Sequence, residues 1–155
     1  MQSVTSKLRP IPIGYHSITP ILRVEVAAKL IDFLKQAFQA VERERFMAPD
    51  GRVSHAEVKI GDSVVMISDA NDEWKPMQAS LNLYTEDTDA IYTQALEAGA
   101  TSLMEPADQF YGDRSAGVKD PFGNQWWIST HMEDVAPEEL ERRMKAFYAE
   151  RKPAT

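Results

Sequence analysis

The sequence predicts an α+β protein that consists of two modules, each with the element order strand, helix, strand, strand, strand. Two observations lead to this prediction. First, some stretches alternate between apolar and polar side chains with the period of a strand, and others have apolar side chains at the period of a helix. Second, the order of these stretches begins again near residue 79. We expect an extended arm at residues 1–15, modules at residues 16–76 and 77–131, and a C-terminal helix and tail at residues 132–155.

Local composition and side-chain periodicity separate the predicted arm from the first strand and helix of the first module. Residues 1–15 are polar and contain two prolines and a glycine, which predicts a segment without secondary structure. Residues 17–24 have the composition of a strand, in which Pro20 is tolerable at an edge, a bulge or the strand start. Residues 26–40 have apolar side chains at spacings of three and four, so they predict an amphipathic helix.

Three further strands complete the first module, at residues 43–47, 53–60 and 63–68. The second of them alternates, with His55 and Glu57 on the face opposite the apolar residues. A turn at Gly61-Asp62 joins it to the third, as in a hairpin, and a polar loop that carries Trp74 follows at residues 69–76.

The second module repeats this order. Residues 79–84 predict a strand, and residues 85–98 predict a helix, because capping and acidic residues precede its apolar positions. Gly99 is a natural end for this helix. Residues 100–104 predict a short strand, while residues 109–118 are compatible with either a strand or a loop.

The final strand follows the sequence Asp120-Pro121-Phe122-Gly123, which matches a type I β-turn. At residues 125–130, period two separates Trp126 and Ile128 from a more polar face. Such a strand packs on a helix with one face and lines a ligand cavity with the other. Residues 137–151 predict a last helix, whose apolar stripe must cover either its own sheet or a second subunit.

Charge and composition exclude several classes of function. The net charge of -7 disfavours partners rich in phosphate, so we expect neither nucleic acid nor a membrane surface as a partner. The absence of cysteine excludes disulfides, thiolate nucleophiles and cysteine-ligated metals. The sequence has no apolar run of transmembrane length and no apolar signal-peptide core, which predicts a cytoplasmic protein.

Three stretches resemble the vicinal oxygen chelate superfamily, which contains glyoxalase I, bleomycin-resistance proteins and extradiol dioxygenases, and most of all its PhnB-like, uncharacterised branch. They are Ile18-Thr19-Pro20-Ile21-Leu22-Arg23-Val24, His55-Ala56-Glu57-Val58-Lys59-Ile60-Gly61-Asp62, and Tyr111-Gly112-Asp113-Arg114 running on to Asp120-Pro121-Phe122-Gly123. The resemblance implies paired modules whose mixed sheets curl into a glyoxalase-like cup, commonly completed in a homodimer, with a small organic ligand inside.

Metal-using members of the superfamily place four ligands on the first and fourth strands of each module. Alignment of the flanking strands puts these positions on Thr19, Met66, Ser80 and Trp127. None of the four offers the imidazole or carboxylate donors that zinc, nickel or iron require. The resemblance therefore implies a site without metal, and we expect no cofactor.

The same alignment defines the residues expected to contact a ligand. They are Thr19, Arg23, Met66, Ser80, Asn82, Tyr84, Arg114 and Trp127. Trp127 would serve as a stacking platform or simply fill a metal-free cup, and Arg23 would pair with an anionic ligand or with an internal glutamate. Arg114 belongs to a polar cluster with Tyr111 and Asp113 that would line the cavity mouth or form an ion pair that fixes the loop.

The sequence thus predicts a metal-independent small-molecule-binding protein of the glyoxalase/bleomycin-resistance type, which sequesters a drug or a metabolite in the cup of a dimer. The alternative is a glyoxalase-like lyase or isomerase with a displaced metal or a metal-free acid-base pair, for which His55, Glu57, Tyr111 and Asp113 have suitable side chains. A third alternative is an interaction module that uses the C-terminal helix to bind another protein.

Overall fold

The structure, a computed structural model, describes residues 7–151. The part of the predicted arm at residues 1–6 and the tail at residues 152–155 lie outside the described residues. The chain divides into two compact units at Met77 and Gln78, and the last turn of the first helix, Gln36–Phe38, groups with the second unit. Each unit is described by itself below.

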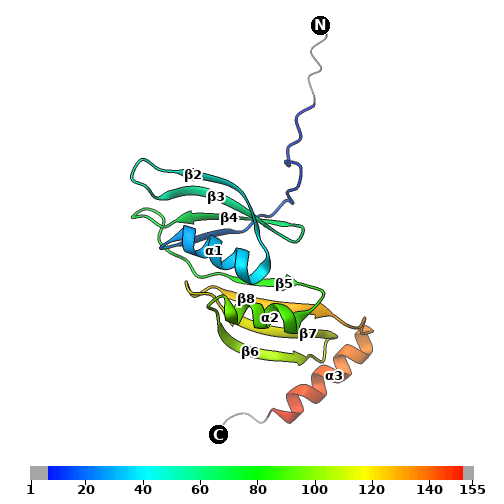
Figure 1. Ribbon diagram of the computed structural model, residues 1–155. Helices are drawn as coiled ribbons and strands as arrows, with labels where there is room; N and C mark the ends of the chain where they lie inside the picture. Colours follow the sequence, from blue (N-terminus) through cyan, green and yellow to red (C-terminus); the bar gives the residue numbers. More distant parts are fainter. Residues whose placement is uncertain (1–6, 152–155) are drawn as a thin grey trace. The chain divides into compact units, whose positions relative to one another are not determined.

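The first unit contains a four-stranded mixed sheet and one helix (Figure 1). Its elements are β1 (Ile21–Val24), α1 (Ala27–Phe38), β2 (Val41–Met47), β3 (Val53–Ile60) and β4 (Ser63–Asp69). The strand order is β1-β4-β3-β2. β1 runs parallel to β4, while the pairs β4/β3 and β3/β2 are antiparallel, as expected for strands joined by short connections.

The first strand is shorter than the sequence suggested. It begins at Ile21 rather than at residue 17, and the first ladder contact comes from the Pro20 carbonyl, which accepts a hydrogen bond from Met66 N at 2.9 Å. Proline has no N–H to donate to a strand ladder, and Pro20 accordingly lies just before the first residue of the strand. β2, by contrast, begins two residues earlier than expected, at Val41.

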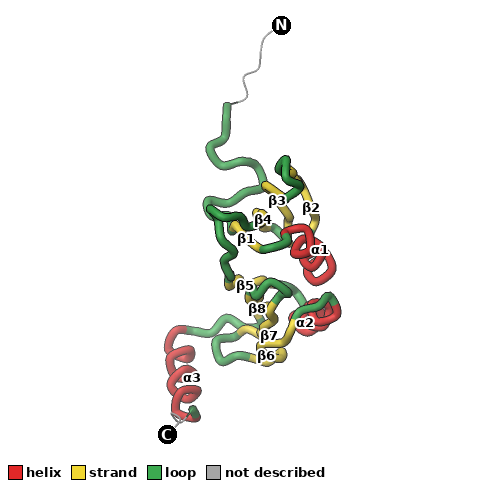
Figure 2. Tube along the Cα trace, turned by 90° about the vertical axis from the view of Figure 1, so that its left-hand side faces the viewer, coloured by secondary structure: helices red, strands yellow, loops and turns green. Residues whose placement is uncertain are grey.

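The core of the first unit combines the apolar stripe of α1 with one face of the sheet. Leu30, Ile31 and Leu34 of α1 are fully buried, and the helix lies alongside this sheet in Figures 1 and 2. The strand residues that share this burial are Leu22, Val24, Ala56, Val58, Val65 and Ile67. Each large apolar side chain contributes roughly 1.5–3 kcal/mol when it is fully buried. The predicted apolar face is therefore the covered one.

The second unit repeats the topology of the first. Its elements are β5 (Ser80–Tyr84), α2 (Thr88–Glu97), β6 (Thr101–Asp108), β7 (Asp113–Lys119), β8 (Gln125–His131) and α3 (Pro137–Glu150). The strand order is β5-β8-β7-β6, and β5 is parallel to β8. α2 contacts β6, β7 and β8. The α+β class and the two βαβββ modules predicted from the sequence are confirmed.

Two elements of this unit differ from the sequence expectation. β6 continues to Asp108 instead of ending at residue 104, and its pairing with β7 is irregular around Pro106, where a bulge accommodates the missing N–H. The segment at residues 109–118 is mostly strand, because β7 begins at Asp113. A turn closed by the bond from Gly112 N to Gln109 O precedes it.

A buried carboxylate organises the start of β8. Asp120 Oδ1 accepts hydrogen bonds from Phe122 N at 2.8 Å and Asn124 N at 3.0 Å, and its Oδ2 accepts from Asn124 Nδ2 and from Trp126 Nε1. Asn124 Oδ1 in turn accepts from Ala79 N, at the start of β5. The turn, β8 and β5 are thus tied to one side-chain network.

α3 begins at Pro137, as the sequence predicted, but none of its residues is buried. Its contacts run through Phe147, whose ring centroid lies 5.0 Å from that of Phe110, and through Arg143, which donates to the Phe110 carbonyl. On the same helix Met144 is 40% exposed and Tyr148 is 63% exposed. Within residues 7–151, no helix has the length and apolar character required to cross a membrane.

Replacement of the Asp120 carboxylate should destabilise the fold. Asp120→Ala leaves four donors without their partner, of which the two Asn124 groups and the Trp126 indole N–H are buried. We expect a loss of about 3 kcal/mol in the free energy of unfolding. Urea unfolding followed by circular dichroism measures it. Asp62→Ala, in an exposed turn where the carboxylate accepts one bond from Ser63 Oγ, is the control and should cost less than about 0.5 kcal/mol. Equal losses in both variants would contradict the role given to Asp120.

Candidate functional site

The face of the first sheet opposite the buried one carries most of the predicted site residues of that unit. Strand pairing places Ile21, Met66, Glu57 and Glu44 in one row across the four strands. Arg23 and Ser68 form the next row. We call this side the open face of the first sheet. Thr19 is half-buried just before β1.

Arg23 lies at the wall of a pocket of about 370 Å³ where β1 and β4 end and β3 begins. The pocket lining consists of Arg23, Ala48, Asp50, Arg52, Val53, Ser54, Ser68, Asp69, Asn71 and Trp74. The Arg23 guanidinium carbon stands 4.8 Å from the Trp74 ring centroid, which is a cation–π geometry. No ion pair with a glutamate, the alternative considered for Arg23, occurs among residues 7–151.

A second polar group on this face surrounds Glu57, which is only 4% exposed. Glu57 Oε2 accepts a hydrogen bond from the Tyr15 hydroxyl, and its Oε1 lies 3.2 Å from His55 Nε2. Burial opposes ionisation of Glu57, but the bonds from Tyr15 and His55 outweigh it and hold the pKa of Glu57 below its ordinary value. The donor atoms of Glu44, His55 and Glu57 all lie within 4.8 Å of one another.

Glu44 reaches this face because of a bulge in β2. Glu42 pairs with Val58, whereas Glu44 pairs with Glu57, so the register shifts by one residue between them. Without the shift, Glu44 would lie opposite Ala56, on the face that packs against α1. Two carboxylates therefore stand directly opposite each other on neighbouring strands, with His55 beside them.

In the second unit, the open face of the sheet carries Ser80, Asn82, Tyr84 and Trp127. Pairing places Asn82 beside Trp127 and Tyr84 beside Ser129. The hydroxyl of Ser129 lies 2.9 Å from that of Ser115 and donates to Asn82 Oδ1 at 2.9 Å. This wall of aromatic, hydroxyl and amide groups matches the mixed face that the sequence predicted.

The indole of Trp127 has a fixed position on this wall. Its ring covers Gly117 of β7 so closely that a Cβ added there would lie 2.4 Å from the indole Cζ3. The indole N–H donates to Ser80 Oγ at 3.2 Å. Trp127 is half-buried, so part of its ring remains accessible.

Tyr84 belongs to a hydrogen-bonded chain of titratable groups. Its hydroxyl donates to Asp113 Oδ2 at 2.9 Å, and the other oxygen of Asp113 lies 2.8 Å from His131 Nδ1. His131 Nε2 is 2.7 Å from Asp134. The bond to Asp113 raises the pKa of the Tyr84 phenol, and bonds to Asp134 and Asp113 raise the pKa of His131. Tyr111 is exposed in the preceding turn, with its ring against Phe110.

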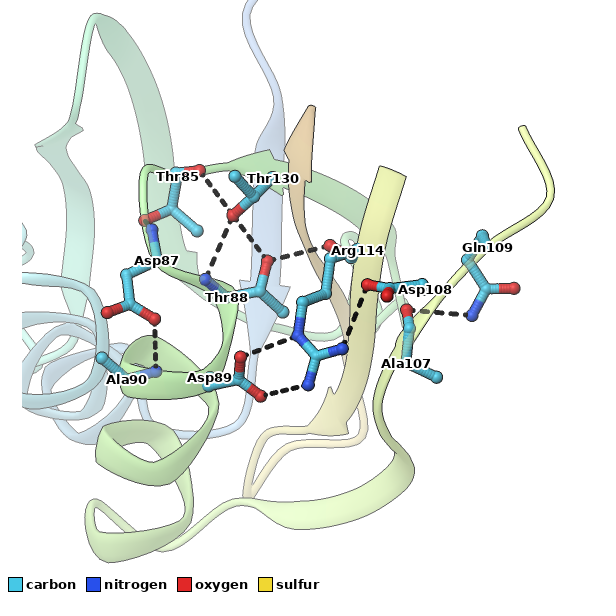
Figure 3. A network of polar contacts seen from close by, with 10 residues as sticks. All are labelled: Thr85, Asp87, Thr88, Asp89, Ala90, Ala107, Asp108, Gln109, Arg114 and Thr130. Atoms are coloured by element: carbon cyan, nitrogen blue, oxygen red, sulfur yellow. Dashed lines mark hydrogen bonds and ion pairs between the residues drawn. The ribbon is translucent and has the colours of Figure 1, made fainter. Parts of the chain in front are cut away.

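Arg114 lies on the other face of this sheet, toward α2 (Figure 3). Its guanidinium donates two bonds to Asp89, at 2.7 and 2.9 Å, and one to Asp108 at 3.1 Å. These carboxylates raise the pKa of Arg114. Arg114 thus forms an ion pair away from the open face that holds Tyr84 and Trp127.

Several residues of these sites were not singled out from the sequence, among them Tyr15, Trp74 and Glu44. Tyr15 was assigned to an arm without structure, Trp74 to a polar loop, and Glu44 to a strand of unknown register. Each reaches its partner through the path of a loop or the position of a bulge. The one available signal was the occurrence of an aromatic residue in an otherwise polar loop at Trp74.

Comparison with known proteins identifies the family. The profile of the Glyoxalase/Bleomycin resistance protein/Dioxygenase superfamily matches residues 14–128. The chain belongs to this superfamily. An uncharacterised protein of Mycobacterium bovis is 34% identical over 141 residues, which cover 84% of this chain and 93% of that protein. An uncharacterised protein of Mycobacterium tuberculosis is also 34% identical, and the alignment covers 84% of this chain and 83% of that protein.

Solved structures of other proteins share the fold. TioX from Micromonospora sp. ML1 aligns with a TM-score of 0.63 and 19% identity, over 75% of this chain and all of that one. A glyoxalase/bleomycin resistance protein/dioxygenase family enzyme from Burkholderia phytofirmans aligns with a TM-score of 0.59 and 18% identity, over 72% and 95% of the two chains. At this identity the similarity concerns the fold alone.

The four positions that the sequence resemblance predicts for metal ligands carry side chains that are poor partners for a metal. Met66 offers a thioether, and Thr19 and Ser80 offer neutral hydroxyls. At the fourth position the Trp127 indole donates its only N–H to Ser80 and has no lone pair for a cation. Glu57 is the strand partner of Met66 on β3, so a carboxylate lies next to this position.

A side chain at position 117 should displace the Trp127 ring. We expect Gly117→Ala to cost about 1–3 kcal/mol in the free energy of unfolding, the range for an overpacked contact. In a Trp127→Ala background the same substitution should cost much less, because the ring that it meets is gone. Denaturant unfolding of the four proteins gives the coupling. A cost that is unchanged without the ring would show that Gly117 is required for another reason.

Proposed function

We propose that this protein binds a small organic molecule on the open faces of its sheets without the help of a metal ion, as a sequestering protein for a drug or a metabolite. The observation that carries the proposal is the wall formed by Trp127, Asn82 and Ser129 in the second sheet. Ligand pockets combine an aromatic surface with a few fixed polar groups, and this wall has both.

The position of Trp127 is suited to stacking. Its ring is held by Gly117 behind it and by Ser80 at its edge, so little conformational entropy remains to be lost when a planar ligand binds. Arg23 and Met66 supply a cation and an adaptable apolar surface on the open face of the first sheet. The proposal leaves out Arg114, because two carboxylates already bind its guanidinium on the opposite face of the second sheet.

We also propose that the protein belongs to the PhnB-like branch, that it works in the cytoplasm, and that it forms a homodimer. Residues of α3, among them Met144 and Tyr148, expose apolar surface that a second copy would cover. Sedimentation tests the dimer, because a species with the mass of a single chain would contradict it, and cell fractionation tests the location.

Removal of the Trp127 ring should weaken the binding of planar aromatic compounds. We expect Trp127→Ala to reduce their affinity by more than ~1 kcal/mol, the scale of a lost aromatic contact. Isothermal titration of both proteins with a panel of neutral aromatic compounds measures it. Tyr92→Ala, which removes a half-buried ring from α2 on the other face of the sheet, should leave the affinity unchanged. Equal affinity of the Trp127→Ala variant and the original protein would remove Trp127 from the site.

One observation favours a second function, that of a glyoxalase-like lyase or isomerase with a displaced metal. Glu44, His55 and Glu57 offer two carboxylates and one imidazole, a donor set typical of zinc, manganese and iron sites. The same His55 and Glu57, or Tyr111 and Asp113 in the second unit, would serve as a metal-free acid-base pair. In this case the protein would turn over its ligand instead of storing it.

Metal analysis separates the two functions. Under the first proposal, protein purified without chelators holds no stoichiometric zinc, nickel, manganese or iron. Under the second, it holds about one ion per chain, which Glu57→Gln removes because the buried carboxylate is lost. Glu42→Gln is the control, since Glu42 pairs with Lys35 and Arg45 instead. A stoichiometric metal that depends on Glu57 would overturn the first proposal.

A further inference from the structure

Arg23 differs from Arg52, the other cation in the lining of its pocket, in what its guanidinium contacts. The side chain is half-buried on the open face of the first sheet, with the Trp74 ring 4.8 Å from its guanidinium carbon. Within residues 7–151 no side-chain hydrogen bond or ion pair satisfies its N–H groups; its backbone carbonyl accepts a bond from Met77 N. A half-buried cation without an anionic partner is costly, so the site favours an anion from outside.

The two carboxylates of the pocket are already engaged. Asp69 accepts hydrogen bonds from Ala27 N and Val53 N, both at 2.6 Å, and so fixes the starts of α1 and β3. Asp50 accepts a bond from Arg52 N and lies 3.7 Å from its guanidinium. Arg52 also donates to the Ala70 carbonyl at 3.1 Å. Arg23 therefore remains as the cation available to a ligand.

The neighbours of Arg23 provide further donors. Asn71 Oδ1 accepts bonds from Glu73 N and Trp74 N, which leaves the Asn71 NH₂ group as a donor. The hydroxyls of Ser54 and Ser68 also line the pocket. The Trp74 ring packs against one side of the Arg23 guanidinium and so holds its orientation. The planar set of N–H groups of a guanidinium can donate two parallel hydrogen bonds to the two oxygens of a carboxylate or phosphate.

We propose that this pocket binds the oxyanion group, carboxylate or phosphate, of a small organic ligand, with Arg23 as its direct partner and Trp74 as the platform that orients the guanidinium. This inference rests on the proposed small-molecule-binding function and names the ligand class. The volume of about 370 Å³ suffices for a small ligand.

The test compares charged probes with a neutral probe of the same shape. Isothermal titration of the Trp127→Ala variant, which lacks the ring proposed for neutral aromatic ligands, should show binding of benzoate and of phenyl phosphate. Benzamide should bind this variant about tenfold more weakly or not at all, the scale of charge-assisted hydrogen bonds. The better of the two anions identifies the oxyanion. In the original protein, the Arg23 Nε–Hε resonance should shift on addition of the anion, a measurement that needs no variant.

Variants assign the binding to Arg23. Arg23→Gln should lower the affinity for the anion by about tenfold or more, and Arg23→Lys should lie between, because it keeps the charge and loses the fork. Arg52→Gln is the matched control in the same pocket and should change the affinity by less than about twofold, since Arg52 is paired with Asp50. Near-UV circular dichroism verifies the fold of each variant.

Three results would overturn the oxyanion site: benzamide that binds as well as benzoate, an equal loss in the Arg23→Gln and Arg52→Gln variants, or no binding of either anion. They leave the function proposed above to its own test, because that test uses neutral aromatic compounds and Trp127. Neutral binding that is unchanged in the Trp127→Ala variant, together with anion binding that depends on Arg23, would in turn support this site alone.

Discussion

A single helix covers one face of each four-stranded sheet, and this constraint governs where the chain can place polar side chains. Ile67 and Val58 of the first sheet and Trp126 and Ile128 of the second are buried on the covered face. The opposite faces carry arginine, glutamate, asparagine, tyrosine and a second tryptophan. Because strand side chains alternate, every strand contributes to both environments. The candidate sites are a direct consequence of this arrangement.

Hydrogen bonds order the open faces. Ser129 links Ser115 to Asn82, Tyr84 binds Asp113, and Tyr15 binds Glu57. Within residues 7–151 no buried side-chain nitrogen or oxygen lacks a partner. Networks of this kind hold their members in one arrangement, since an unpaired buried polar group is costly. Arg23 differs because its N–H groups contact no acceptor in the described part of the chain. These N–H groups are therefore available to hydrogen-bond a ligand.

The family comparison and the geometry together locate the difference between this chain and metal-using members. The match over residues 14–128 shows the superfamily, and the four positions predicted for metal ligands hold two hydroxyls, a thioether and an indole. Glu57 lies one strand away from Met66, as its partner on β3, and Tyr15 and His55 bind its carboxylate. Superfamily membership therefore establishes the fold, while the function has to be argued from residues that are particular to this chain.

The sequence by itself determined the order of the strands and helices, although not the bounds of β1, β2 and β6. Side-chain periods of two and 3.6 and the turn at Asp120-Pro121-Phe122-Gly123 are local properties, so they can be recognised without the fold. The sequence also assigned Leu22 and Trp126 to covered faces and Arg23 and Trp127 to open ones. Tertiary structure decided the contacts between distant residues, such as Trp74 on Arg23 and Gly117 beneath Trp127. The bulge that turns Glu44 toward Glu57 belongs to this second group. A one-residue shift in strand register moves a side chain to the opposite face of the sheet. The pairing between strands sets this shift, and local sequence patterns do not encode the pairing.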